Sequence, residues 1–133
     1  MSERIKAEVE LARTLYPALE YRDEGHWVRV PNFKLPEGWS IRQTELVFQF
    51  PQAGYPQTAF YGFYVESGIR FNGATPKNFT DPSPAKPPFA RAWAFFSGNP
   101  DPWMPSPAIG AGSNVLSWLR SVSERFRQGV GSD

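Results

Sequence analysis

Residues 50–60 read Phe50-Pro51-Gln52-Ala53-Gly54-Tyr55-Pro56-Gln57-Thr58-Ala59-Phe60, and this stretch decides how the chain is interpreted. Two X-Pro pairs and a glycine predict a bend, because proline and glycine interrupt regular structure. An alternating run, Thr44 to Phe50, precedes the bend, and an apolar run, Phe60 to Val65, follows it. The bend therefore connects two predicted strands, and so short a connection favours antiparallel pairing.

Upstream of the bend, the sequence predicts a third strand and a helix. His26 to Val30 is β-branched and aromatic, as strands are. Apolar residues recur at helical spacing from Ile5 to about Tyr16, where the following proline disfavours further helix.

Polar residues complete the expected N-terminal helix. We expect Ser2 to cap it. Glu8 and Glu10 should lie on its solvated face, with Arg4 and Lys6 as ion-pair partners one turn away. Leu11 and Leu15 should widen its apolar face.

Downstream of the bend, residues 76–107 contain nine of the fourteen prolines, which suppresses regular strand pairing. Residues 89–96 are the exception, because large side chains alternate with alanines there, as in an extended segment packed on a neighbour. Aromatic anchors favour an ordered, wrapping loop over a disordered linker. These anchors are Phe79, Phe89, Trp93, Phe95, Phe96 and Trp103.

A second helix closes the chain. Apolar residues repeat at helical spacing from Val115 to Phe126, Ser113 or Asn114 is the expected cap, and Gly129 is the expected stop. We expect one domain over residues 1–128 and a flexible C-terminal tail over 129–133.

Composition restricts the function. Lys and Arg number 14 against 13 Asp and Glu, a net charge of +1. Proteins that bind duplex nucleic acid or anionic membranes are typically more basic, so we expect neither partner. The chain has no cysteine and one histidine, His26, which excludes disulfides, a thiol nucleophile and multi-histidine metal sites. We expect no metal and no cofactor.

The lack of long apolar segments bears on where the protein is located. The charged N-terminus lacks the apolar core of an export signal. Apolar runs are far shorter than the ~20 residues of a spanning helix. We therefore expect a cytoplasmic protein.

The order of predicted elements resembles the ubiquitin-conjugating enzyme superfamily. There, a helix and a four-stranded antiparallel meander precede a proline-rich stretch, an active-site loop and another helix. The superfamily's Phe-Pro, Tyr-Pro, Pro-Pro joint is similar to residues 50–60, with Thr58-Ala59 in place of the last prolines. Its Trp-x-Pro is similar to Trp103-Met104-Pro105. The resemblance implies an α+β fold with a meander of about four strands.

A closer resemblance is to the prokaryotic ubiquitin-conjugating-like family designated E, from bacterial ubiquitin-like modification operons. Its joint, aromatic segment and Trp-x-Pro are similar to Gly54-Tyr55-Pro56, Trp93-Ala94-Phe95-Phe96-Ser97 and Trp103-Met104-Pro105. The chain departs from the superfamily in lacking the catalytic cysteine and the His-Pro-Asn tripeptide. It also departs from family E, where basic residues are expected in place of Gly98-Asn99-Pro100.

Without a thiol, a hydroxyl would have to hold the acyl group as an oxyester. Ser97 lies six residues before Trp103, near where the resemblance places the thiol, and Asp101 is the nearest carboxylate in sequence. We predict Ser97 as the acyl acceptor, oriented or deprotonated by Asp101. Ser97 is also typical of a turn whose hydroxyl bonds to backbone. The alternative hydroxyls are Thr80, Ser83, Ser106 and Ser113, the last also a helix cap.

Three functions remain open. The chain could be a conjugating enzyme that receives a ubiquitin-like protein from an activating enzyme. It could instead be a non-catalytic variant that binds the ubiquitin-like protein or the activating enzyme through its first helix and meander. Thirdly, it could be an aromatic-rich β-domain that binds peptide or carbohydrate in a cleft lined by Trp93 and Trp103. His26 is a further, weaker candidate for a general base.

Overall fold

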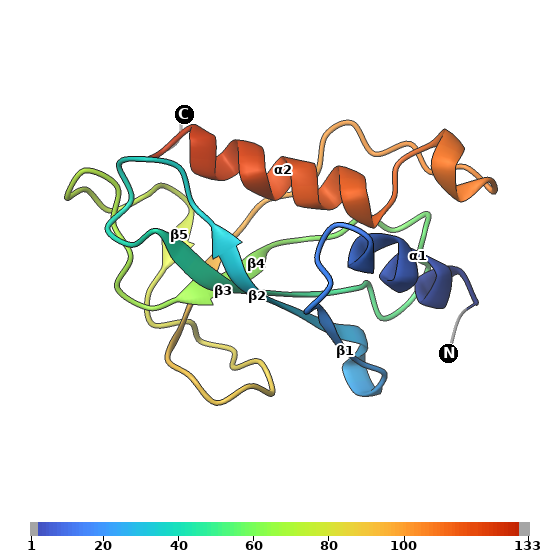
Figure 1. Cartoon of the computed structure of the whole chain (residues 1–133), viewed down its shortest axis with the longest axis horizontal. Helices are drawn as coiled ribbons and strands as arrows, with labels where there is room; N and C mark the ends of the chain where they lie inside the picture. Colours follow the sequence, from blue (N-terminus) through green and yellow to red (C-terminus); the bar gives the residue numbers. More distant parts are fainter. Residues whose placement is uncertain (1–2, 131–133) are drawn as a thin grey trace.

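The computed structural model describes residues 3–130, so the proposed Ser2 cap and residues 131–133 lie outside the described part. Two helices and six strands occur in an α+β arrangement (Figure 1). They are α1 (Glu3–Arg13), β1 (Glu20–Arg22), β2 (Trp27–Lys34), β3 (Gln43–Gln49), β4 (Phe63–Glu66), β5 (Phe79–Thr80), β6 (Trp93–Phe96) and α2 (Val115–Arg127), with short 3-10 turns at Glu24–His26 and Ile109–Ala111.

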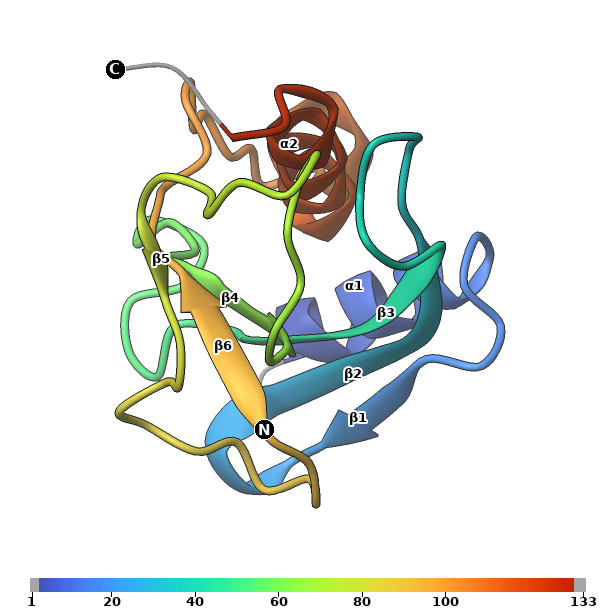
Figure 2. The same cartoon turned by 90° about the vertical axis from the view of Figure 1, so that its left-hand side faces the viewer.

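The strands form one antiparallel sheet in the order β1-β2-β3-β4-β6-β5 (Figure 2). The meander of consecutive neighbours from β1 to β4 agrees with the expected antiparallel connections. The expectation of about four strands is wrong, because the proline-rich segment contributes two more. Residues 93–96 contain no proline, so β6 pairs along β4 from Phe63↔Phe96 to Glu66↔Trp93.

Both helices pack on one face of the sheet, and the segment 81–92 crosses the other face (Figure 1). The indole ring of Trp118 on α2 lies 6.3 Å from the ring of Phe48 and 6.0 Å from that of Phe63. On the opposite face, Trp93 receives a hydrogen bond at its carbonyl from the Ser83 amide and donates its indole N–H to the Phe89 carbonyl. The expectation of an ordered, wrapping segment is therefore confirmed.

Three element boundaries differ from expectation, and the first is that β2 continues through Pro31 to Lys34 instead of ending at Val30. Helix α1 ends at Arg13, although the Tyr16 amide still bonds to the Ala12 carbonyl at 2.9 Å. The strand expected over residues 60–65 begins only at Phe63, because Gly62 takes a φ of +72° and its amide bonds to the Gly98 carbonyl. Phe60 instead turns into the core and stacks on Trp118.

A side-chain cap and a glycine mark the two ends of α2. Asn114, not Ser113, is the N-cap: its side chain accepts from Leu116 and Ser117, and its own amide donates to the Ser117 hydroxyl. At the other end Gly129 follows the helix with a φ of +72°, as expected of a stop. The Val130 carbonyl accepts from the Lys77 amide, which ties the end of α2 to the proline-rich segment.

Candidate functional site

The bend at residues 50–60 and the later tryptophan meet in space. The Trp103 indole N–H donates to the Pro56 carbonyl at 2.8 Å. The Trp103 ring also lies 6.1 Å from the ring of Tyr55 and 5.6 Å from that of Phe60. Trp103 therefore contacts the bend directly in the folded chain.

A buried carboxylate joins this scaffold to both helices. Glu8 is fully buried, and its Oε1 accepts from the Tyr55 hydroxyl at 2.5 Å and from the Val115 amide at 2.7 Å. Its Oε2 accepts from Arg4 Nε at 2.6 Å. We call these four residues the Glu8 network. Burial, together with the hydrogen bond to Glu8, raises the pKa of the Tyr55 hydroxyl far above its usual value.

The expectation that Glu8 lies on a solvated helix face is wrong. Three hydrogen-bond donors from three segments take the place of the water that would solvate the Glu8 carboxylate, which allows it to be buried. The signal was present in the sequence, because Glu8 lies three residues after Ile5 and four before Ala12, on the buried stripe of α1. Glu10 is exposed as expected, but it pairs with Arg13 and not with Lys6.

Backbone contacts hold the segment that carries Ser97. Strand β6 ends at Phe96, and the Ser97 amide then bonds to the Asn78 carbonyl at 2.9 Å. The Gly98 carbonyl accepts from Gly62 at 2.8 Å, and the Asn99 side chain donates to the Phe60 carbonyl at 3.4 Å. Ser97 is thereby fixed beside the residues that follow the bend.

Ser97 and Asp101 line the same cavity, which has a volume of about 270 Å³. Its opposite wall is formed by α2, including Trp118, Ser121 and Arg125. The two predicted site residues are therefore brought to one place. A second hollow of about 400 Å³ shares Asp101, Ser121 and Glu124 with the first and lies beside it on a neighbouring face of α2. We call the two hollows together the α2 groove.

The polar groups of this cavity differ in how they are satisfied. The Arg125 guanidinium donates to the Lys77 and Gly129 carbonyls and lies 4.9 Å from the Phe96 ring centroid, and burial lowers its pKa. Within residues 3–130, however, neither the Ser97 hydroxyl nor the Asp101 carboxylate has a hydrogen-bond partner. The Trp118 indole N–H is buried and also lacks a partner in the described chain.

The alternative hydroxyls are mostly engaged. Ser83 donates to the Ala85 carbonyl at 2.7 Å, while Ser106 and Ser113 accept from the Ala108 and Met104 amides. Thr80 lies exposed on β5 at the edge of the sheet. In residues 3–130 the Ser97 hydroxyl, by contrast, makes no hydrogen bond to the backbone, which the turn interpretation requires.

The remaining candidates lie elsewhere. His26 Nδ1 is 2.9 Å from the Tyr21 hydroxyl, outside the cavity that holds Ser97. Trp93 is buried beside Phe89 on the sheet face opposite the helices, whereas Trp103 packs on Tyr55 and Pro56. The two tryptophans contact different neighbours, so the shared cleft expected of a peptide- or carbohydrate-binding domain is not formed by them.

Comparisons of the chain with protein-family models, with curated proteins and with solved structures give no match. Across residues 3–130, no helix has the length and apolar character needed to cross a membrane. In the same residues no group of three or more His, Cys, Asp or Glu side chains is placed to hold a metal ion.

Proposed function

We propose that the chain is a conjugating-enzyme-like component of a bacterial ubiquitin-like modification pathway, in which Ser97 holds the C-terminal acyl group of the modifier as an oxyester. The observation that carries this proposal is the cavity shared by Ser97 and Asp101 against α2. The contact between Trp103 and Pro56 supports it further, because it joins the two motifs on which the family resemblance rests.

Loading would be an acyl transfer from the activating enzyme. The Ser97 hydroxyl oxygen attacks the activated carbonyl carbon, a new C–O bond forms, and the bond to the donor's leaving group breaks with its electron pair. The hydroxyl proton passes to the Asp101 carboxylate as general base. In the second step a target amine attacks the ester carbonyl carbon, a C–N bond forms, the ester C–O bond to Ser97 breaks with its electron pair, and the proton lost by the amine passes to the Ser97 oxygen.

The α2 groove supplies a binding site for an extended modifier tail. Its two hollows lie side by side on neighbouring faces of α2 and share three residues, so together they form one surface that extends from Arg120 to Ser97. The buried Trp118 N–H, which has no partner within residues 3–130, would donate to a carbonyl of this tail. An unsatisfied buried donor of this kind favours a ligand that brings an acceptor.

Reconstitution tests the proposal. The chain is mixed with a candidate modifier, its activating enzyme and ATP, and the products are analysed by mass spectrometry before and after hydroxylamine treatment. We expect a hydroxylamine-labile adduct on Ser97 that Ser97→Ala abolishes. The matched controls Thr80→Ala and Ser106→Ala should keep it. Absence of any adduct with a demonstrably active modifier pair contradicts catalysis, and an adduct that survives Ser97→Ala contradicts the assignment of Ser97.

In a second candidate function, the chain binds the same partners but catalyses no reaction. It is favoured by the lack of a hydrogen bond between Asp101 and Ser97 and by the absence of cysteine from the sequence. In this case the chain binds the ubiquitin-like protein or the activating enzyme, and Ser97→Ala leaves both binding and pathway activity unchanged. Titration calorimetry with each partner, beside the adduct assay, separates the two functions.

A further inference from the structure

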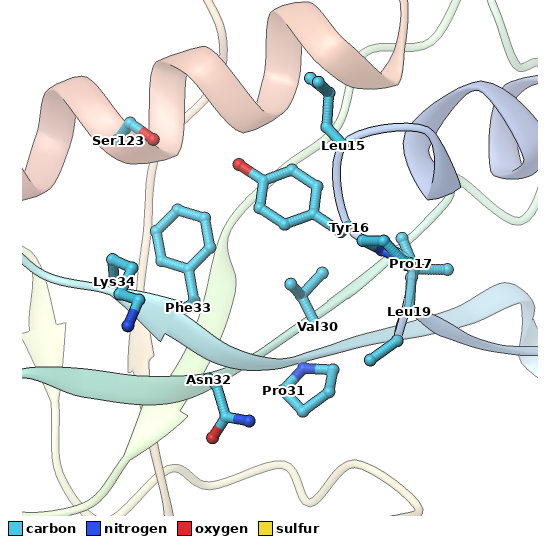
Figure 3. Close-up of a pocket in the computed structure, with 11 residues that line it drawn as sticks. Leu15, Tyr16, Pro17, Leu19, Val30, Pro31, Asn32, Phe33, Lys34 and Ser123 are labelled. Atoms are coloured by element: carbon cyan, nitrogen blue, oxygen red, sulfur yellow. The ribbon is translucent and has the colours of Figure 1, made fainter.

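A second apolar cleft lies on the opposite side of α2 from Ser97. Its volume is about 370 Å³, and it is lined by residues 15–19, by residues 30–34 of β2 and by Ser123 of α2. The rings of Tyr16 and Phe33 stand side by side in it, below Ser123 (Figure 3). Ser123 also lines the α2 groove, so the cleft and the groove meet at this residue. The width of α2 lies between the cleft and Ser97.

The cleft is preformed by packing. The Tyr16 ring stacks on Phe33 at 5.9 Å, and Phe33 in turn packs on Phe126 of α2 at 6.0 Å. The Leu19 amide bonds to the Tyr16 carbonyl at 2.9 Å, which closes the segment that forms one wall. A ligand would therefore meet fixed walls and would lose little affinity to ordering of the protein.

The walls expose apolar surface that the fold does not cover. Leu15 is 63% exposed, against 4% for Phe33 at the floor of the cleft. Pro17 and Ala18, beside it, are also exposed. A preformed cleft with an exposed aliphatic rim suits an apolar side chain of a partner.

Three polar groups of the cleft are free to bind an anion, whereas the side chain of Asn32 already accepts a hydrogen bond from Gln43 at 3.0 Å. Lys34 is the one charged residue that lines it, and within residues 3–130 it forms no ion pair. The hydroxyls of Tyr16 and Ser123 have no hydrogen-bond partner in that part of the chain either. Burial raises the pKa of Tyr16, so this hydroxyl remains a donor at neutral pH. No carboxylate lines the cleft to compete.

Pairing with an added strand is disfavoured here. Strand β1 pairs with β2 only along Trp27 to Arg29, so the later part of β2 has a free edge. Pro31 lies on this edge and lacks an N–H, and the register to β3 shifts between Val30 and Phe33. Recognition must therefore come from side chains and not from a backbone ladder.

We propose that this cleft docks an acidic segment of a partner protein that presents one aliphatic side chain beside a carboxylate. The aliphatic group packs on Tyr16 and Leu15, and the carboxylate faces Lys34. A partner held there lies across α2 from Ser97, so docking would raise its effective concentration at the α2 groove. The docking itself does not depend on the proposed oxyester chemistry.

Nuclear magnetic resonance of the ¹⁵N-labelled full chain tests the docking. The probe is the pentapeptide acetyl-Gly-Asp-Leu-Asp-Gly-amide, compared with versions in which Asn replaces both Asp or Ala replaces Leu. We expect shifts confined to the amides of residues 15, 16, 18 and 19, of residues 32–34 and of Ser123, with weaker binding of both altered peptides. Octanoate, as a small amphiphilic acid, should bind no more tightly than the peptide.

Matched exposed variants sharpen this experiment. Lys34→Glu should weaken binding about fivefold, as expected for the loss of one exposed charge pair. Leu15→Ser should weaken it about threefold through lost apolar contact. Lys86→Glu and Met104→Ser alter a similar exposed lysine and an exposed apolar residue elsewhere and should have no effect. Shifts outside the cleft, equal binding of the Asn peptide, tighter binding of octanoate, or no binding at all would each overturn the proposal.

Discussion

The Glu8 network and the α2 groove both contain a carboxylate, but they satisfy it in opposite ways. Glu8 is buried and accepts three hydrogen bonds from Arg4, Tyr55 and Val115. Asp101 is exposed in the groove and has no hydrogen-bond partner within residues 3–130. The first region fixes how the two helices and the bend sit on each other. The second leaves polar groups available to a ligand.

This difference separates stability from function. Removing a group from a fully satisfied buried network leaves its partners unsatisfied, which is costly to folding. Removing an unpartnered group from an open groove costs folding little. Substitutions in the Glu8 network should therefore lower the free energy of unfolding, whereas substitutions in the α2 groove should affect ligand binding. Any substitution that does the reverse would contradict this comparison.

The largest effect is expected for Glu8→Ala. It leaves the Tyr55 hydroxyl, the Val115 amide and the Arg4 guanidinium without their common acceptor, and we expect a loss of about 3 kcal/mol in the free energy of unfolding. Urea unfolding followed by circular dichroism measures it. Glu10→Ala, on the exposed face of the same helix, is the control and should change stability by less than about 0.5 kcal/mol. Equal losses in the two variants would contradict the role of the network.

The Tyr55 hydroxyl should make stability fall at high pH. Its pKa is raised in the folded protein, so folding favours the neutral hydroxyl. The stabilisation is complete below the unfolded pKa of about 10 and decreases as the pH rises above it. Tyr55→Phe should lower stability by about 1–2 kcal/mol at neutral pH and should weaken this decline.

Urea midpoints at about pH 8 and about pH 11 measure the pH effect. The pKa values of Tyr16, Tyr21 and Tyr64 are also raised, so part of the decline will remain in Tyr55→Phe. Tyr61→Phe, at an exposed tyrosine, is the control and should follow the unaltered chain. A Tyr55→Phe protein with the full decline would show that ionisation of Tyr55 is not coupled to folding.

Local patterns in the sequence predicted much of the fold. The helical spacing of Val115 to Phe126 and the alternation of Thr44 to Phe50 each depend on neighbouring residues, and both elements are found there. Strands β5 and β6 are short, two and four residues, and their pairing depends on partners distant in sequence. Such strands have too few residues to show a period, so the strand number was wrong.

The candidate site was predictable in part for the same reason. Ser97 and Asp101 are four residues apart, so their common cavity follows from one short segment. The Glu8 network joins residues 4, 8, 55 and 115, and only its helical part, Arg4 and Glu8, was evident from spacing. The donors from Tyr55 and Val115 come from tertiary contacts that no local pattern encodes.

Trp103→Phe should have an intermediate effect on stability. It removes the hydrogen bond to the Pro56 carbonyl and part of the ring contact with Tyr55 and Phe60, and we expect a loss of about 1–2 kcal/mol. The control is Trp27→Phe, because Trp27 is likewise half-buried and stacks near Tyr64. Thermal unfolding of both variants measures the difference. A smaller loss for Trp103→Phe than for Trp27→Phe would show that the contact between the two motifs does not stabilise the scaffold.

The smallest effect on stability is expected for Ser97→Ala, within about 0.5 kcal/mol of the unaltered chain, because the hydroxyl makes no hydrogen bond within the described residues. Ser83→Ala is the control, since the Ser83 hydroxyl is buried and donates to the Ala85 carbonyl, and it should cost about 1 kcal/mol. Urea unfolding of the two variants under one condition measures both. If Ser97→Ala destabilised the chain as much as Ser83→Ala, the Ser97 hydroxyl would be serving the fold, and the α2 groove would be an extension of the structural frame with no polar group left for a ligand.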